Sequence, residues 1–263
     1  MDKSQKNFSA LPAYHNKIFL DSDDGRAIRI LSEYLEPLYR LKREGVHDTV
    51  VFFGSARLTE DGPLGKYYQA AHQLSFKLTE WSKTLKGSKR FVICSGGGGG
   101  IMEAANRGAH DAGGSTIGFN IGLPHEQRPN PYITPALLFE FHYFFMRKLW
   151  FSHLARALIV FPGGFGTLDE FTEMLTLAQT KKIDRPIHIL LYGSEYWDDV
   201  LNLEKLAHNG MIDPADLKLI HRVDDVDSAF EYLKKYLPLD ETNGLPAFAK
   251  TQFSRPCAAP EEL

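Results

Sequence analysis

A cationic pair, Arg147 and Lys148, lies between two apolar runs, residues 144–146 and 149–151. Long basic side chains beside apolar residues can simply extend their charged ends to solvent at the start of a helix. They can also clamp an anion, because both side chains donate several hydrogen bonds from a positive charge. From the residues alone, both interpretations stay open.

A glycine-rich segment, Pro-Gly-Gly-Phe-Gly-Thr at residues 162–167, follows the clearest apolar run of the chain. Glycines let backbone N–H groups approach a phosphate, and a Thr at a helix N-cap would add a hydroxyl and the positive end of the helix. We therefore predict phosphate contacts from Gly163, Gly164, Gly166 and Thr167. The alternative is a capping box, in which Glu170 merely bonds back to the Thr167 backbone.

Five consecutive glycines, residues 96–100, follow Ser95 and precede a helical pattern. This order suits contact with a phosphate or ribose, and we predict such contacts for Gly97, Gly98 and Gly99. A flexible turn is the alternative. The run is not a dinucleotide fingerprint, because Ile101 or Met102 takes the place of the third glycine, and no Gly-Lys-Ser/Thr closes a Walker A loop.

Short apolar runs separated by helical patterns make up most of the chain. Strands are predicted at residues 50–53, 91–94, 115–119, 138–142, 157–161 and 187–192. Apolar strands without polar alternation are typical of a parallel sheet covered on both faces, so we predict an α/β, doubly wound, Rossmann-type fold. Residues 25–238 are expected to form this single domain, with an N-terminal arm at residues 1–24 and a C-terminal tail at residues 239–263.

Four unusual segments each follow a predicted strand: residues 54–57 (Gly-Ser-Ala-Arg), the glycine run, residues 145–148 and residues 162–167. Ligands of open parallel sheets lie outside the carboxyl ends of the strands, and right-handed crossovers bring these ends to one edge. We therefore expect the four segments to surround one pocket, with Gly54 and Ser55 among the residues that bind the nucleotide.

The composition argues against several classes of partner. The net charge is −3, the two cysteines cannot form a disulfide framework, and no apolar stretch approaches a membrane span. We expect a cytoplasmic protein that binds neither nucleic acid nor membranes. No metal is expected, because the histidines are too scattered to form a ligand cluster.

These segments resemble the Lonely Guy (LOG) family, the cytokinin riboside 5′-monophosphate phosphoribohydrolases, which are often mislabelled as lysine decarboxylases. The family pattern is Arg-Lys followed by Pro-Gly-Gly-x-Gly-Thr-x-x-Glu, and residues 147–148 and 162–170 match every fixed position. The similarity runs over about residues 50–192 and includes residues 123–127 (Leu-Pro-His-Glu-Gln). The N-terminal helix and last segment resemble the longer bacterial branch. One departure is Met146 directly before Arg147, where short members have Met-His-x-Arg-Lys.

The resemblance implies that Arg147 and Glu170 form the catalytic pair, that the glycine loops bind a 5′-phosphate, and that Met146 and Lys148 lie beside the nucleotide. The implied reaction is hydrolysis of the N-glycosidic bond of a nucleoside 5′-monophosphate, such as AMP or a cytokinin riboside monophosphate, to free base and ribose 5-phosphate. No cofactor is implied. The sequence does not identify the base.

Three rival functions make different demands on the sequence. A non-catalytic carrier of a phosphate ligand, similar to molybdenum-cofactor carriers, would use the same fold. A lysine decarboxylase needs pyridoxal phosphate on a lysine, for which we find no motif, and a nicotinamide dehydrogenase is disfavoured by the missing glycine. We also expect a homodimer or larger homo-oligomer, formed through apolar faces of residues 102–109 and of the aromatic helix near Trp150.

Overall fold

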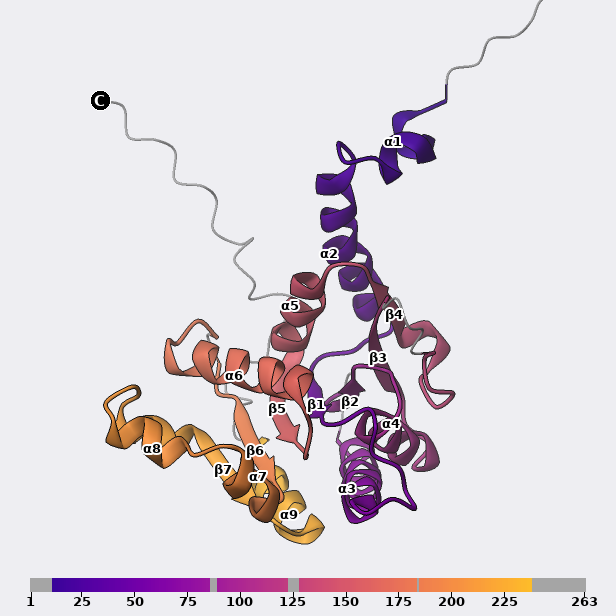
Figure 1. Cartoon of the computed structure of the whole chain (residues 1–263). Coiled ribbons are helices and arrows are strands. Elements are labelled where there is room, and N and C mark those ends of the chain that lie inside the picture. Colours follow the sequence, from indigo (N-terminus) through magenta and orange to yellow (C-terminus); the bar gives the residue numbers. More distant parts are fainter. Residues whose placement is uncertain (1–10, 86–88, 123–127, 184, 238–263) are drawn as a thin grey trace, which may run out of the picture.

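The computed structural model describes residues 11–85, 89–122, 128–183 and 185–237. Its centre is a seven-stranded, fully parallel sheet with the order β4-β3-β2-β1-β5-β6-β7 (Figure 1). The strands are β1 (Thr49–Phe53), β2 (Val92–Ser95), β3 (Thr116–Ile121), β4 (Leu138–Phe141), β5 (Ala155–Val160), β6 (His188–Tyr192) and β7 (Ile220–Val223).

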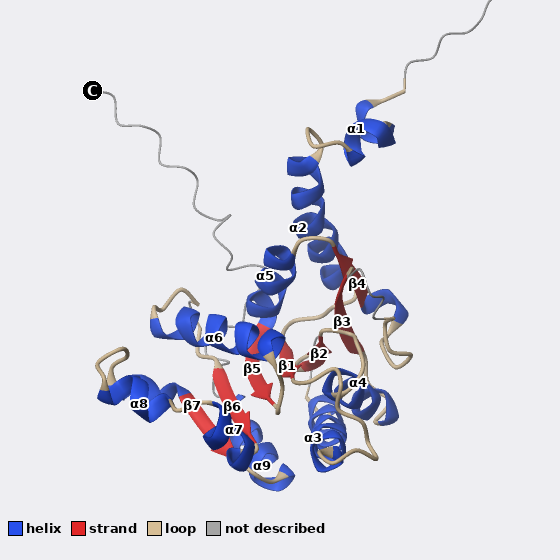
Figure 2. Cartoon of the chain, viewed as in Figure 1, coloured by secondary structure: helices blue, strands red, loops and turns tan. Residues whose placement is uncertain are grey.

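Helices cover both faces of this sheet (Figure 2). One face packs against α3 (Gly65–Lys83), α4 (Ile101–Asp111) and α9 (Val226–Tyr236). The other face packs against α2 (Arg26–Arg43), α5 (Phe144–Leu154), α6 (Phe165–Gln179) and α7 (Ser194–Val200). Shorter elements are η1 (Ala13–His15), α1 (Lys17–Asp21), η2 (Pro135–Leu137), α8 (Leu203–His208) and η3 (Pro214–Leu219). The predicted doubly wound α/β fold is confirmed.

The central strand β1 explains why the apolar runs do not alternate with polar residues. Val50 and Phe52 belong to the core between the sheet and α3, whereas Val51 and Phe53 belong to the core on the opposite face. All four side chains are almost fully buried. A strand covered on both faces has to be apolar at successive positions, because neither side meets water.

The strand order reverses between β1 and β5, and this position determines where a ligand can bind. From β1 the chain winds outward through β2, β3 and β4, and it then returns to β5 on the other side of β1. The two loops that leave β1 and β5 diverge to opposite faces, which opens a crevice at the carboxyl ends of these strands. Backbone hydrogen bonds continue past the strand ends, from Phe161 N to Phe53 O (2.8 Å) and from Ser55 N to Pro162 O (3.0 Å).

The structure adds elements that the sequence patterns did not predict. β7 is a short edge strand that contains His221 and Arg222, so it lacks the apolar run by which the other strands were recognised. Residues 13–21 of the predicted arm form η1 and α1, which lie beyond the projecting amino end of α2 (Figure 1). Residues 1–10 and the predicted tail lie outside the described residues, and the division into arm, domain and tail stays a prediction.

Of the two apolar faces that we expected to be exposed, the face of α4 is buried within the chain and the aromatic helix α5 is buried only in part. Ala104, Ala105 and Ala109 of α4 are fully buried in the core shared with α3. Trp150 is also fully buried, and its indole N–H donates to the backbone carbonyl of Glu33 (2.9 Å). The expectation was therefore wrong for α4, whose apolar face packs against α3, whereas Phe144, Phe145 and Leu149 of the aromatic helix α5 are 50%, 51% and 37% exposed. Within the described ranges, no helix is both long and apolar enough to cross a membrane.

Candidate functional site

A cavity of about 960 Å³ opens at the crevice between the loops that follow β1 and β5. Its walls come from residues 54–59 and 62–64 of the β1–α3 loop and from residues 162–168 at the start of α6. Arg147 of α5, Glu170 of α6 and Tyr196 of α7 complete the polar part of the lining. Four of the predicted elements of the site, Gly54 and Ser55, the Pro162–Thr167 loop, Arg147 and Glu170, therefore meet at one cavity.

Arg147 and Glu170 are in direct contact within this cavity. Arg147 Nη2 donates to Glu170 Oε1 over 2.8 Å, and the two side chains are only 12% and 13% exposed. The guanidinium carbon of Arg147 lies 5.5 Å and 5.6 Å from the ring centres of Phe144 and Phe151. Aromatic rings on the same helix therefore hold the guanidinium in place while it faces the carboxylate.

The environment of Glu170 shifts its ionisation towards neutral pH. Burial raises the pKa of Glu170 from 4.5 to about 7; the positive charge of Arg147 opposes this shift, and the nearby Asp169 carboxylate adds to it. A carboxyl group whose pKa is close to neutral can exchange protons with a substrate or a water at neutral pH. Glu170 therefore has the properties of a general acid or base, in addition to a carboxylate's ability to stabilise positive charge.

The start of α6 differs from the prediction in its register. The helix begins at Phe165 with Gly164 as its N-cap, so Thr167 is the third helical residue rather than the cap. Glu170 bonds to Arg147, and the alternative of a Thr167–Glu170 capping box is thereby removed. Gly164, Phe165 and Gly166 are exposed, which leaves the first N–H groups of the helix accessible from the cavity. Such a helix end attracts anions.

Tyr196 is a residue of the site that the sequence reasoning missed. Its hydroxyl donates to the carbonyl of Gly163 over 2.9 Å and so fixes the loop that precedes α6. Gly163 is itself closely packed, because a Cβ at this position would lie 2.2 Å from Thr167 Oγ1 and 3.0 Å from Ser55 N. Only its position in the sequence could have indicated this role, because Tyr196 follows the carboxyl end of predicted strand 187–192.

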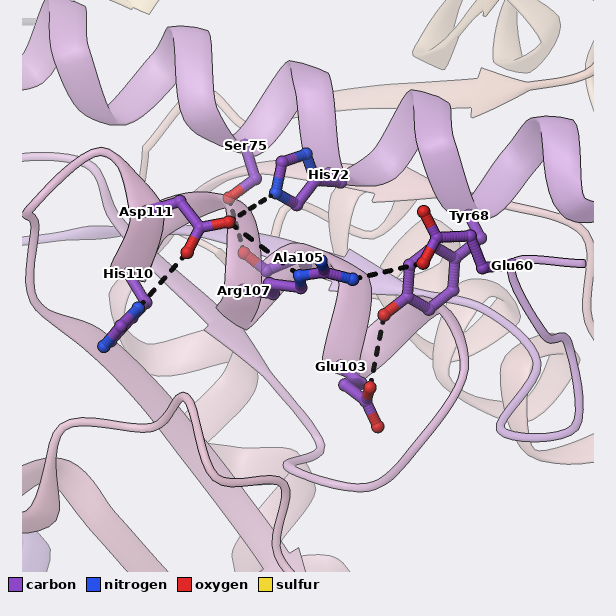
Figure 3. A network of polar contacts seen from close by, with 9 residues as sticks. All are labelled: Glu60, Tyr68, His72, Ser75, Glu103, Ala105, Arg107, His110 and Asp111. Atoms are coloured by element: carbon purple, nitrogen blue, oxygen red, sulfur yellow. Dashed lines mark hydrogen bonds and ion pairs between the residues drawn. The ribbon is translucent and has the colours of Figure 1, made fainter.

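The β1–α3 loop, residues 54–64, forms the opposite wall of the cavity. Ser55 Oγ accepts from the backbone N–H of Arg57 (3.1 Å), and Ser55 O accepts from Ile101 N (3.0 Å). Further along the loop, Glu60 pairs with Arg107 of α4 over 3.1 Å (Figure 3). Arg107 also faces Asp111, which accepts from His72 of α3. This network attaches the loop to the helix layer beneath it.

The glycine run has a different position from the one we predicted. Gly97 and Gly98 are buried, and their carbonyls accept from the Asn130 side chain at 3.1 and 3.0 Å. Among the described residues that line the cavity, none comes from residues 96–100. Only Gly96 approaches the catalytic candidates, since a Cβ there would lie 3.7 Å from Arg147 Nη1. The run packs closely against Asn130 and other segments, and ligand contacts of Gly97, Gly98 and Gly99 stay a prediction.

Lys148 and Met146 also lie away from this cavity. Lys148 pairs with Asp169 (2.6 Å) and Glu173 (3.1 Å), and these residues line a separate hollow of about 510 Å³. Met146 is 4% exposed and belongs to the core. Consecutive helical residues point in directions about 100° apart, so only Arg147 of this triplet faces the cavity. Residues 123–127, which contribute to the resemblance, lie outside the described residues.

A family model described as "Possible lysine decarboxylase" matches residues 102–233, just over half of the 263-residue chain. The chain belongs to this family. Its match includes Arg147, Glu170 and the Pro162–Thr167 loop.

Curated relatives carry a more specific name. The "Probable cytokinin riboside 5′-monophosphate phosphoribohydrolase LOGL5" of Oryza sativa subsp. japonica is 29% identical over 191 residues, 72% of each chain. LOG3 of Arabidopsis thaliana, also named a cytokinin riboside 5′-monophosphate phosphoribohydrolase, is 27% identical and covers 73% of this chain and 83% of its own. A bacterial enzyme of that name, from Rhodococcoides fascians, is 29% identical over 56% of this chain and 74% of its own. The resemblance to the Lonely Guy family is thereby confirmed.

Solved structures share the fold at lower identity. A molybdenum cofactor binding protein from Rippkaea orientalis is 19% identical with a TM-score of 0.51, covering 74% of this chain and 98% of its own. The X-ray structure of TM1055 is 18% identical with a TM-score of 0.50, covering 72% and 99%. At these identities the likeness extends to the fold alone, because one fold supports many functions.

The name of the family raises the question of a pyridoxal phosphate site. Such a site requires a lysine that can form a Schiff base with the cofactor. The described residues that line the cavity include no lysine, and Lys148 is paired with two carboxylates beside another hollow. The residues of this cavity therefore do not fit pyridoxal phosphate.

Proposed function

We propose that this protein hydrolyses the N-glycosidic bond of a nucleoside 5′-monophosphate, either AMP or a cytokinin riboside monophosphate, to free base and ribose 5-phosphate. The observation that carries the proposal is the buried Arg147–Glu170 pair, which faces a cavity bounded by the amino end of α6. The names of the curated relatives support the same reaction.

Cleavage of a glycosidic bond passes through an oxocarbenium-like state, with positive charge on the ribose and negative charge on the departing base. The Glu170 carboxylate stabilises the ribose cation and accepts a proton from the attacking water. Its pKa of about 7 is suited to this proton transfer, because acceptor strength and availability are balanced near neutral pH. Arg147 keeps its proton throughout and acts electrostatically by orienting Glu170.

The phosphate supplies binding energy remote from the bond that breaks. The exposed residues Gly164, Phe165 and Gly166 present the amino end of α6, where backbone N–H groups and the helix dipole favour an anion. Anchoring the 5′-phosphate there holds the ribose in a fixed position relative to Glu170. Such positioning accelerates the reaction without any further chemical group.

The test is to incubate the purified protein with AMP and to measure adenine and ribose 5-phosphate by chromatography, with adenosine as the phosphate-free substrate. Release of both products supports the proposal. If the protein binds AMP but releases neither product, the result would instead favour a non-catalytic carrier. A panel of nucleoside monophosphates with different bases would identify the preferred base.

We also propose that the protein acts as a homo-oligomer in the cytoplasm. Although the apolar face of α4 is buried, apolar side chains are exposed on α5, the aromatic helix that contains Trp150, and on α2. They are Phe144, Phe145, Leu149, Ile28, Leu31 and Leu35. Exposed apolar patches often mark protein interfaces. Sedimentation velocity would test this, and a monomer at micromolar concentration would contradict it.

A further inference from the structure

The cavity contains two arginines among its described lining residues, Arg57 and Arg147. They differ in their partners. The guanidinium of Arg147 is buried and bonded to Glu170, so its charge is already balanced within the protein. Arg57 is exposed at the cavity wall, and no carboxylate in the described part of the chain pairs with its guanidinium.

The backbone that carries Arg57 is held in place on both sides. Arg57 N donates to Ser55 Oγ, and Ser55 is bonded through its N–H to Pro162 and through its carbonyl to Ile101. Three residues after Arg57, Glu60 is paired with Arg107 of α4 (Figure 3). The position of the Arg57 backbone relative to the opposite wall is therefore fixed, although its side chain is exposed.

The opposite wall presents the amino end of α6. The β1–α3 loop and the loop before α6 touch directly, since a Cβ on Gly163 would lie 3.0 Å from Ser55 N. An anion at this helix end would lie between backbone N–H donors on one side and the Arg57 loop on the other. A phosphate ester carries close to two negative charges at neutral pH. Helix N–H groups alone offset only about half a charge, so a full cation has a clear role there.

We propose that Arg57 is a specificity-determining residue that binds the 5′-phosphate and so selects nucleoside monophosphates over nucleosides. This inference rests on the proposed function and deepens it. Arginine suits the task because its planar guanidinium can donate two parallel hydrogen bonds to phosphate oxygens. Arg57 thus binds the phosphate, whereas Arg147 stays paired with Glu170 beside the ribose, where the bond is cleaved.

The test compares Arg57→Gln, Arg57→Lys and wild type by steady-state kinetics with AMP and adenosine. Arg57→Gln should raise KM for AMP by about tenfold to a hundredfold, the loss expected for charge-assisted hydrogen bonds, and should reduce the preference for AMP over adenosine by a similar factor. Arg57→Lys should recover part of the loss. Lys66→Gln is the charge-matched control, because Lys66 pairs with Glu195 beside a separate hollow.

A second measurement separates this inference from the proposed function. Calorimetric titration with ribose 5-phosphate should show binding to wild type and at least tenfold weaker binding to Arg57→Gln, with unchanged melting temperature. Equal affinity in both proteins, or no binding to wild type, would overturn the role of Arg57. Failure of wild type to release any base would overturn the proposed reaction alone, since the titration does not depend on turnover.

Discussion

Arg147 Nη2 and Glu170 Oε1 lie 2.8 Å apart in a largely buried pair that joins α5 to α6 at the wall of the cavity. The pair links two properties that a glycosidase site needs. Glu170 is withdrawn from water, which brings its pKa close to neutral, and Arg147 keeps its carboxylate oriented.

Replacing the Glu170 carboxylate should abolish most of the activity. Glu170→Gln keeps the shape and one hydrogen-bond acceptor but removes the negative charge and the proton acceptor, so kcat for AMP should fall at least about a hundredfold. Ribose 5-phosphate binding should change little. Glu231→Gln is the matched control, because Glu231 is an exposed residue of α9 that pairs with Lys234 and does not line the cavity. Retained turnover in Glu170→Gln would remove this residue from the mechanism.

The pH dependence of kcat should report the ionisation of Glu170. The folded pKa is raised to about 7, so the carboxylate form that the mechanism requires is scarce at pH 5 and predominant at pH 8. We expect kcat to rise about tenfold per pH unit below the inflection and to level off above it. Using kcat rather than kcat/KM limits interference from the phosphate of free AMP, which ionises near pH 6. A flat profile from pH 5 to 8 would exclude this role.

Removing the Tyr196 hydroxyl should loosen the loop that precedes α6. Tyr196→Phe deletes the hydrogen bond to Gly163 O, and a single neutral hydrogen bond is worth about 1 kcal/mol, so kcat/KM for AMP should fall by about fivefold. The melting temperature should change only slightly. Tyr232→Phe is the control, because this ring stacks on His221 away from the cavity. Equal kinetics in both variants would show that Tyr196 does not position the loop.

The glycines Gly100 and Gly210 both have positive φ, but only one of them is closely packed. Alanine substitutions at both positions therefore distinguish the effect of a steric clash from the effect of backbone strain. Gly100 has φ +64°, and a Cβ there would lie 2.1 Å from the carbonyl oxygen of Ser55. Gly210 has φ +72° and nothing within 4 Å of its Cβ position. Both alanine variants should lose about 1–2 kcal/mol of stability from the backbone conformation. Gly100→Ala should lose more, and should also lower kcat/KM, because the clash displaces the Ser55 loop.

Asp48, at the amino end of β1, should stabilise the sheet most strongly at neutral pH. Its buried carboxylate accepts from Phe91 N and from Arg90 Nε (2.8 Å), and His47 also contacts it. Although burial alone would raise its pKa, the hydrogen bond from His47 and the charge of Arg90 lower it below 3.8. This stability is therefore present above pH 3.8 and lost as pH falls through the lower folded pKa.

Asp48→Asn should consequently reduce the free energy of unfolding by about 3–5 kcal/mol at pH 7, the usual effect of breaking a buried ion pair. The difference from wild type should shrink below pH 4. Urea unfolding at pH 7 and below pH 4 measures this difference in the free energy of unfolding. Asp227→Asn is the control, because it removes an exposed ion pair. If both variants lost equally little stability at pH 7, the Asp48 cluster would not support the sheet.

Short stretches of the sequence predict most of the strands and helices of this fold. Apolar runs such as residues 50–53 and 157–161 predicted buried parallel strands, because a strand covered on both faces has no polar positions. Strand ends then located Gly54, Ser55 and the Pro162–Thr167 loop at one edge. β7 was missed because an edge strand such as His221-Arg222 needs no apolar run.

Contacts between distant segments were decided only by the tertiary structure. Arg147 and Lys148 are neighbours with the same charge, yet helix rotation directs Arg147 to Glu170 and Lys148 to Asp169. The glycine run is packed against Asn130, and Tyr196 approaches Gly163 from another helix. Side-chain direction, burial and the pKa of Glu170 depend on how whole elements pack. Local residue patterns specify which elements form, whereas the packing of those elements sets which side chains meet and how far water is excluded from them.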